Sequence, residues 1–283
     1  MLDYEKILCE IEKLKRKFCY FNIGKTSLNQ NIVCFKLTAN KNTKKNIVVS
    51  ACFHAREFVT SYLLCKQLKF LNNFYLDCNV YFIPLVNVDG VNICSHGIRD
   101  IKNIFRREKI NFSILQTGIK NGYKLFKSNA NCVDINTNFD ALWGNGKNNL
   151  FYPSYQNFVG YMPNSERETK ALISLINVVN TSLVLCYHSK GEVVYYGFKD
   201  QDNSMIKIQK KLLKCICKNT GYKGIFTKNS CGGFKDYCII KRKILGFTIE
   251  VGSDKLPHPI KKSYLPHIFK ENMFVVQDLL KEI

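Results

Sequence analysis

Residues 46–57 read NIVVSACFHARE, and the rest of the chain can be organised around this stretch. Its first eight residues are mostly apolar and β-branched, which is typical of a buried strand, and the amphipathic run Phe58–Leu71 that follows predicts a helix. His54 and Glu57 therefore lie where a strand passes into a helix. An imidazole and a carboxylate three residues apart on a helical turn can bind one metal ion, although the same spacing also occurs in solvated surface pairs.

The length and composition fit a globular protein of 283 residues, 46% of them hydrophobic. A chain of this size can bury the core of one large α/β domain or of two small ones, and we favour one domain over residues 1–283. No run of eighteen apolar residues is present, and the N-terminus lacks a basic segment followed by an apolar one. We therefore expect a cytoplasmic protein with no membrane partner.

The thirteen cysteines include no C-x-x-C pair. An odd number scattered through apolar runs indicates neither a disulfide framework nor a zinc ribbon, so we interpret them as reduced thiols.

The net charge of +20 would attract nucleic acid, an anionic surface or an acidic substrate. The basic residues are spread in short groups between apolar positions, and no recognisable nucleic-acid motif accompanies them. We interpret them as a solvated lysine-rich surface and do not expect a nucleic-acid partner.

Alternating strand and helix patterns predict an α/β fold. The predicted strands are Ile32–Leu37, Asn46–Phe53, Asn79–Val86, Cys132–Ile135, Ser182–Tyr187 and Ile244–Val251. The predicted helices are Leu2–Phe18, Phe58–Leu71, Asn164–Asn180, Ser204–Lys218 and Tyr264–Leu280.

Three connections carry their own predictions. The polar segment Asn40–Lys45 predicts a hairpin between the first two strands, and Asn87–Gly90 predicts a turn because its Asp-Gly pair supplies backbone freedom. The polar, basic and weakly periodic stretch Arg99–Lys127 predicts a long connection with little regular structure.

Three predicted strands end at or near a residue with a potentially reactive side chain, namely His54, His188 and Glu250. Ligands of open α/β sheets bind outside the carboxyl ends of strands, so these three residues could share one site. A carboxylate such as Glu250 is costly to bury in an apolar strand unless it has a function or a charged partner. The pattern favours a shared site, with a structural ion pair as the alternative for Glu250.

Five short motifs follow one another along the chain: His54–Glu57, Pro84–Gly90, Val133–Asn136, Tyr187–Ser189 and Phe247–Glu250. Together and in this order they resemble the zinc metallocarboxypeptidase family, the carboxypeptidase A-like peptidases. The resemblance covers roughly residues 21–283, which we take as the catalytic core behind a leading helix in residues 1–20. We expect a single α/β domain with a mixed, largely parallel sheet of eight strands and helices on both faces.

The resemblance implies a metallopeptidase site with one Zn²⁺ per chain. His54, Glu57 and His188 would bind the zinc and leave its fourth position to water. Glu250 would be the general base that takes a proton from this water. Asp134 matches the carboxylate that orients the first histidine of such sites.

The residues that would contact the substrate include two departures from the family pattern. Arg56 matches a subsite arginine. Lys127 lies near the place where many members carry a carbonyl-polarising arginine, and we therefore count Lys127 as a catalytic residue. Asn136 is followed by Thr137, where carboxypeptidases carry the arginine that binds a terminal carboxylate. Lys228 lies near the place of a family tyrosine. Trimming of ordinary protein C-termini is therefore not expected.

These departures, with the segments Gly232–Tyr237 and Gly246–Gly252, resemble the bacterial branch that cleaves γ-D-glutamyl-diaminopimelate bonds in cell-wall peptides. We expect a muropeptide substrate, because a basic protein attracts its several carboxylates. Two alternatives stay open: a zinc carboxypeptidase of ordinary peptides, and a non-catalytic basic binding protein that keeps the fold. The sequence indicates no particular oligomeric state.

Overall fold

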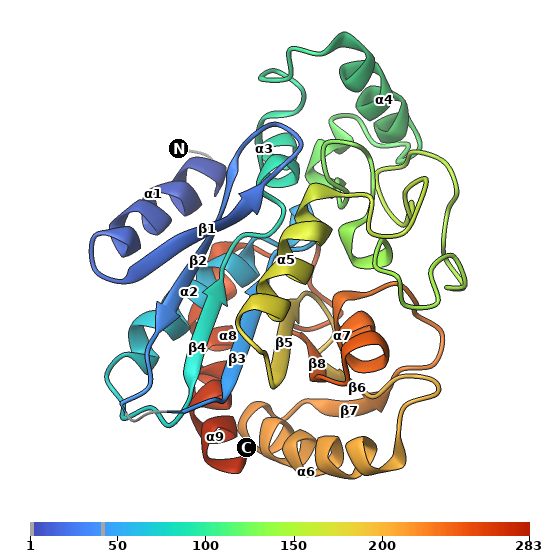
Figure 1. Ribbon diagram of the computed structural model, residues 1–283. Helices are drawn as coiled ribbons and strands as arrows, with labels where there is room; N and C mark the ends of the chain where they lie inside the picture. Colours follow the sequence, from blue (N-terminus) through green and yellow to red (C-terminus); the bar gives the residue numbers. More distant parts are fainter. Residues whose placement is uncertain (1–2, 41–42) are drawn as a thin grey trace.

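A computed structural model describes residues 3–40 and 43–283 (Figure 1). Its centre is an eight-stranded sheet with the strand order β1-β2-β4-β3-β5-β8-β6-β7. The strands are β1 Cys19–Lys25, β2 Asn31–Leu37, β3 Asn46–Ala51, β4 Asn79–Ile83, β5 Leu183–His188, β6 Val193–Tyr196, β7 Lys223–Phe226 and β8 Leu245–Glu250.

The helices surround this sheet. The α-helices are α1 Asp3–Lys15, α2 Val59–Leu71, α3 Val88–His96, α4 Ile104–Leu115, α5 Arg167–Val178, α6 Asn203–Thr220, α7 Phe234–Arg242, α8 Leu265–Asn272 and α9 Val275–Glu282. The 3-10 turns within residues 3–40 and 43–283 are η1 Ala55–Glu57, η2 Gly122–Leu125, η3 Ile135–Thr137 and η4 Lys262–Tyr264.

The sheet is mixed and mainly parallel. Strands β4, β3, β5 and β8 run parallel to one another, β1 and β2 add antiparallel strands at one side, and β6 pairs antiparallel with β8 at the other. The predicted fold class, an α/β domain with a mixed eight-stranded sheet covered on both faces, is confirmed.

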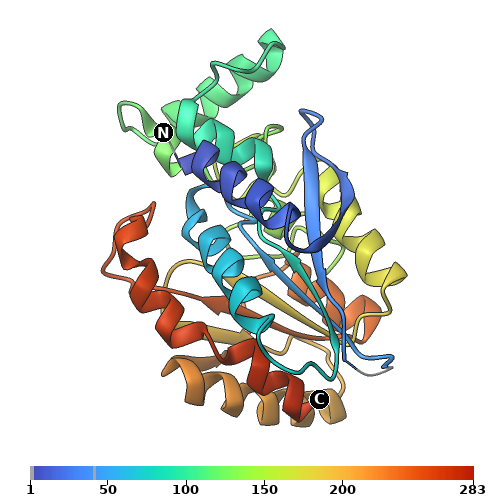
Figure 2. The same cartoon turned by 90° about the vertical axis from the view of Figure 1, so that its left-hand side faces the viewer.

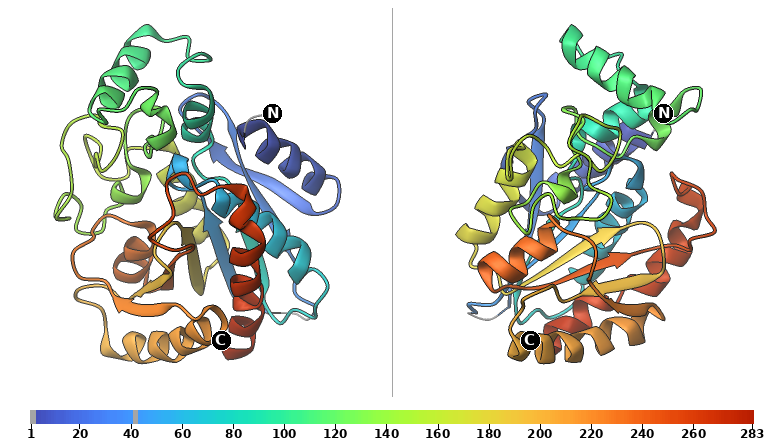
Figure 3. Two further views of the ribbon diagram at one scale, coloured as in Figure 1. Left: turned by 180° about the vertical axis from the view of Figure 1, so that it is seen from behind. Right: turned by 90° about the vertical axis from the view of Figure 1, so that its right-hand side faces the viewer.

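Strand β3 shows why the central strands read as continuous apolar runs. Successive side chains point to opposite faces, and both faces are covered. Ile47 and Val49 contact the core beneath α2, α8 and α9, whereas Val48 contacts the core beneath α5 and α7. Figures 2 and 3 show these two layers of helices on either side of the sheet.

The predicted hairpin between the first two predicted strands is wrong, because β4 lies between β2 and β3 and pairs with both. A strand that is apolar on both faces belongs in the middle of a sheet, and β3 takes that place beside two parallel neighbours. Residues 41 and 42 of the predicted turn, like Leu2 of the predicted first helix, lie outside the described residues.

Two predictions in the middle of the chain are also wrong. The segment Asn87–Gly90 is not an isolated turn but the start of helix α3. The side chain of Asn87 caps this helix by accepting a hydrogen bond from Gly90 N at 2.9 Å. Cys132–Ile135 forms no strand, because its backbone bonds to loop residues, as when Asp134 N donates to Phe158 O at 2.8 Å.

The stretch Arg99–Lys127 contains α4 and η2, so the prediction of little regular structure is wrong there. Asn103 caps α4 by accepting a hydrogen bond from Arg106 N at 2.9 Å. The helical period is obscured because only Ile110, Ser113 and Ile114 are buried, while other large apolar side chains of α4 are exposed.

The short elements β1, β6, β7 and α7 were not predicted, and the single predicted closing helix is divided at Met273 and Phe274 into α8 and α9. Within the described residues, every helix is too short or too polar to cross a membrane.

Candidate metal centre

His54, Glu57 and His188 come together at the carboxyl edge of the sheet. His188 is the last residue of β5, and His54 follows β3, its parallel neighbour, so their strand ends meet. The chain bends sharply after β3, where Cys52 has a positive φ of 57° and its N–H donates to Thr60 Oγ1 at 3.1 Å. This bend turns the 3-10 segment η1, and with it Glu57, back toward His188.

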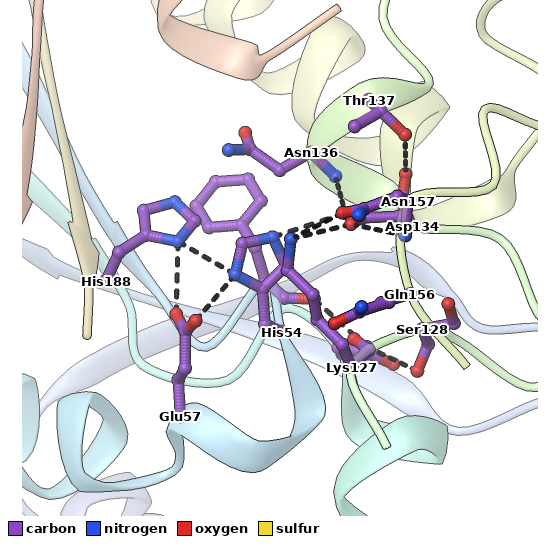
Figure 4. Close-up of polar contacts among 12 residues, drawn as sticks. His54, Glu57, Lys127, Ser128, Asp134, Asn136, Thr137, Gln156, Asn157 and His188 are labelled. Carbon is purple, nitrogen blue, oxygen red and sulfur yellow. Dashed lines mark hydrogen bonds and ion pairs between the residues drawn. The ribbon is translucent and has the colours of Figure 1, made fainter. Parts of the chain in front are cut away.

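The carboxylate of Glu57 spans the two imidazoles (Figure 4). Its Oε1 lies 2.8 Å from His54 Nδ1, its Oε2 lies 3.1 Å from His188 Nδ1, and the two Nδ1 atoms are 3.2 Å apart. All three side chains are buried. One ligand atom from each lies within 4.8 Å of the others, so the three residues could hold a metal ion.

The two carboxylates around His54 test whether a cation fits this position. His54 Nε2 lies 3.2 Å from Asp134 Oδ1, within ion-pair distance but not aligned for a hydrogen bond. Ionised carboxylates offer only acceptor atoms, and a neutral imidazole carries one proton for the two carboxylates, Glu57 and Asp134, that face its two nitrogens. With that proton on Nε2, the lone pair of Nδ1 and the carboxylate of Glu57 face each other at 2.8 Å as two electron-rich groups. A bound cation resolves this conflict, and two imidazole nitrogens with a carboxylate are ligands that suit zinc.

The carboxyl of Glu57 is held in its ionised form. Burial alone raises its pKa, but the neighbouring His54 and His188 outweigh burial and hold the pKa well below its usual value. The backbone N–H of Ser189 also donates to Glu57 Oε2 at 3.2 Å.

Asp134 is fully buried behind His54 and satisfied by several donors (Figure 4). Its Oδ2 lies 2.8 Å from Lys127 Nζ, and its carboxylate accepts hydrogen bonds from Asn136 N and Asn157 N, each at 3.1 Å. Burial raises the pKa of Asp134, but the charges of Lys127 and His54 prevail and lower it well below its usual value. Asp134 is placed to orient both Lys127 and the ring of His54.

Glu250 ends β8 directly beside His188 in the parallel register. Burial and the nearby charge of Glu57 raise its pKa to about 7, against the opposing effects of His188 and Lys127. Its side chain lines a cavity of about 890 Å³ that also reaches His54 and Lys127. A carboxylate beside the proposed metal ligands and open to this cavity can exchange protons with a bound molecule.

The remaining predicted residues divide into two groups. Asn136 and Thr137 line the cavity, but both side chains are engaged: Asn136 Oδ1 accepts from Phe234 N at 3.1 Å, and Thr137 Oγ1 donates to Asp134 O at 3.0 Å. Arg56 is not among the residues that line the cavity, and its guanidinium donates to Leu125 O at 3.2 Å. The structure therefore gathers every predicted site residue except Arg56.

Sequence reasoning missed a buried ion pair in the cavity wall. Lys235 Nζ lies 2.5 Å from Asp236 Oδ1 and also donates to Gly197 O at 2.8 Å and Thr227 Oγ1 at 3.1 Å. Both charged residues line the cavity. The sequence does show two adjacent opposite charges at the start of α7. They indicate a buried ion pair only once α7 is recognised as a helix that packs on the sheet.

Comparison with known proteins agrees with this geometry. The model of the zinc carboxypeptidase family matches residues 6–275. The gamma-D-glutamyl-L-diamino acid endopeptidase 1 of Lysinibacillus sphaericus is 27% identical over 282 residues, which cover 92% of this chain and 68% of that protein.

Two solved structures share the fold. Bovine thrombin-activatable fibrinolysis inhibitor, in complex with a tick carboxypeptidase inhibitor, superposes with a TM-score of 0.74 and 17% identity over 98% of this chain and 94% of that one. The murein-tripeptide amidase MpaA of Escherichia coli O157 superposes with a TM-score of 0.56 and 18% identity over 93% of this chain and 91% of that one.

Proposed function

The chain belongs to the zinc carboxypeptidase family and is a metallopeptidase, and from this premise we propose that it hydrolyses the γ-D-glutamyl-diaminopimelate bond of cell-wall peptides. The observation that carries the proposal is the charge of the cavity. No arginine of the described residues lines it, whereas five lysines do. These are Lys127, Lys147, Lys223, Lys228 and Lys235.

This lining suits some peptides better than others. A free α-carboxylate at a peptide terminus is bound most strongly by the planar fork of an arginine, and Thr137 offers none. Separate ammonium groups suit a substrate with several carboxylates at different positions, as in a γ-D-glutamyl-diaminopimelate peptide. The relative from Lysinibacillus sphaericus, named for a γ-D-glutamyl bond, supports this choice.

His54, Glu57 and His188 hold the zinc of this family in our proposal. When bound at such a site, zinc lowers the pKa of a water molecule and polarises a carbonyl group. Asp134, 3.2 Å from Nε2 of His54, would favour the tautomer that carries its proton on Nε2 and leaves the lone pair of Nδ1 for the metal.

Glu250 serves as the general base. Its carboxylate accepts a proton from the water that attacks the scissile carbonyl carbon and then delivers that proton to the departing amine nitrogen. Its position at the end of β8, beside His188 and open to the cavity, supports this role.

Lys127 supplies positive charge beside the reacting carbonyl. Its ammonium is held by Asp134 at 2.8 Å and by Asn157 Oδ1 at 3.3 Å, and it lines the cavity. Lys127 and Arg56 are the candidates for binding the α-carboxylate of D-glutamate, and Lys127 is the better placed because it lines the cavity and Arg56 does not.

A substrate panel tests the proposal. The zinc-loaded protein is incubated with L-Ala-γ-D-Glu-meso-diaminopimelate and with blocked dipeptides that end in aromatic, aliphatic or basic residues. We expect release of diaminopimelate and little release from the dipeptides, and Glu250→Gln serves as the control for a contaminating peptidase. Efficient cleavage of the dipeptides alone would favour the ordinary carboxypeptidase. Inactivity toward all of them in a zinc-loaded protein would favour the non-catalytic binding protein.

A further inference from the structure

Helix α4 carries two apolar faces, one buried and one exposed. Ile110, Ser113 and Ile114 are buried against the body of the protein. At about 100° per residue, the side chains of Phe105, Phe112 and Leu115 lie on the opposite side of the helix, where they are 77%, 64% and 76% exposed. A helix that only covers the core needs the first face and not the second.

Further apolar side chains extend this exposed face. Ile104, at the start of α4, is 61% exposed, and Ile119, just beyond its end, is 54% exposed. Lys109 reaches over the ring of exposed Tyr161 with its ammonium 6.0 Å from the ring centroid, which places the 161–162 loop beside the helix. Figures 1 and 3 show α4 projecting from the rest of the molecule.

Basic residues flank the exposed stripe. In the helical projection Arg107 lies on one side of it and Lys109 on the other, and Glu108 is the one acidic residue within it. Residues 99–124 contain seven basic and two acidic residues, a net charge of +5. Within the described residues Arg107 has no ion-pair partner, so its charge is available to an outside group.

We propose that the exposed face of α4, formed by Ile104, Phe105, Phe112, Leu115 and Ile119, docks on an anionic lipid bilayer surface. Large apolar side chains between flanking arginine and lysine residues are the pattern of helices that lie in the membrane interface. The expectation of no membrane partner rests on the lack of a long apolar run in the sequence, and a helix that lies in the membrane interface needs no such run.

The charge selects this partner over two others. A second copy of the chain related by two-fold symmetry would bring the same +5 region against itself, which is repulsive. A nucleic acid would pair with the basic residues but would leave the aliphatic side chains Ile104, Leu115 and Ile119 without apolar partners. An anionic bilayer offers partners to both kinds of side chain, because its headgroups are negative and its acyl chains lie just beneath them.

Vesicle sedimentation tests the proposal with the full chain. We expect binding to vesicles of phosphatidylglycerol and phosphatidylcholine, weak binding to pure phosphatidylcholine, and a decrease in affinity as salt is raised. Replacing both Phe105 and Phe112 by serine should weaken binding by about tenfold or more. The matched control is the double variant Tyr75→Ser, Val178→Ser, which removes two exposed apolar side chains elsewhere and should bind like the wild type.

Charge variants test the electrostatic half of the proposal. Glu108→Lys should strengthen binding to anionic vesicles and Arg107→Glu should weaken it, each by about tenfold. Thermal unfolding and zinc content establish that every variant is folded.

Three outcomes would overturn the proposal. One is failure of the wild type to bind anionic vesicles. Another is self-association that disappears in the Phe105→Ser, Phe112→Ser variant while vesicles are not bound, which would assign the face to a second copy. The third is binding of a labelled oligonucleotide that depends on Arg107 but not on the phenylalanines, again without vesicle binding.

Discussion

His54 Nε2 lies 3.2 Å from Asp134 Oδ1, so the other ring nitrogen, Nδ1, is the one that faces Glu57 and His188. Asp134 has no exposure to solvent, and it holds Lys127 through its other oxygen at 2.8 Å. One carboxylate therefore orients a proposed zinc ligand and a cation that lines the cavity.

Asp134→Asn should lower zinc affinity by about 10- to 100-fold, which is the usual effect of removing the partner of a ligating histidine. The amide can present its NH₂ group to His54 and so favours the wrong tautomer. Competition with a chromophoric chelator measures the affinity. Asp140→Asn is the matched control, because Asp140 forms an exposed ion pair with Lys241, and an equal loss there would remove Asp134 from the zinc site.

Replacing His54, Glu57 or His188 by alanine should reduce the zinc content from one ion per chain to nearly none, because a site with three protein ligands retains little affinity after losing one. Metal analysis after dialysis measures this content. His267→Ala is the control, since His267 is exposed and pairs with Glu271, far from the proposed ligands in the sequence. Undiminished zinc in all three alanine variants would disprove the ligand assignment.

Glu250→Gln should keep its zinc and lose about 100-fold or more in turnover of the tripeptide, because the amide cannot accept the proton of the attacking water. Zinc content and kcat are measured on the same preparation. A variant as fast as the wild type would show that another group transfers the proton.

Thr137→Arg should raise kcat/KM for blocked dipeptides by about tenfold, since a guanidinium in the cavity wall can form two parallel hydrogen bonds to a terminal carboxylate. Thr137→Lys supplies the same charge without the fork and should gain less. If the two variants gained equally, net charge rather than bidentate geometry would govern recognition.

Glu168 should make the stability of the fold depend on pH. It is fully buried, its Oε1 has no hydrogen-bond partner among the residues that the structure describes, and burial raises its pKa to about 8. The folded state therefore keeps a proton that the unfolded chain releases above its ordinary pKa of about 4.3. The resulting stabilisation is complete below that lower pKa and is lost as pH rises through about 8, with a slope of at most about 1.4 kcal/mol per pH unit.

Urea unfolding of the chelator-treated protein at several pH values measures this slope without the contribution of zinc. Glu168→Gln keeps the shape but does not titrate, so its stability should vary less between pH 5 and about pH 8 than that of the wild type. Glu12→Gln is the control at an exposed carboxylate. Equal slopes for Glu168→Gln and the wild type would show that Glu168 is already ionised in the fold.

The sequence predicted the centre of the molecule better than its periphery. His54, His188 and Glu250 could be placed together because parallel strands deliver their carboxyl ends to one edge, whatever the order of the strands. The position of β4 between β2 and β3 could not be predicted, because the pairing of neighbours depends on packing across the whole sheet and not on either strand alone.

The missed elements share a physical cause. Strands β6 and β7 have only four residues each, too few for an alternating pattern to be distinguished from a loop. Helix α4 was missed because its two apolar faces cancel the usual amphipathic signal. The side chains of Arg56 and Lys127 could be assigned to the site region, but which one reaches the cavity depended on hydrogen bonds to Leu125, Asp134 and Asn157.

The two walls of the cavity differ in how freely they can change over evolutionary time. The proposed metal ligands and Glu250 stand on or beside β3, β5 and β8, each of which is hydrogen-bonded to a strand on both sides. The second wall comes from β7, the last strand of the same sheet, and from the loops at 146–149 and 227–231. Insertions and substitutions are tolerated best in such loops, so descendants of this chain could acquire new substrates by altering one wall while inheriting the hydrolytic chemistry of the other.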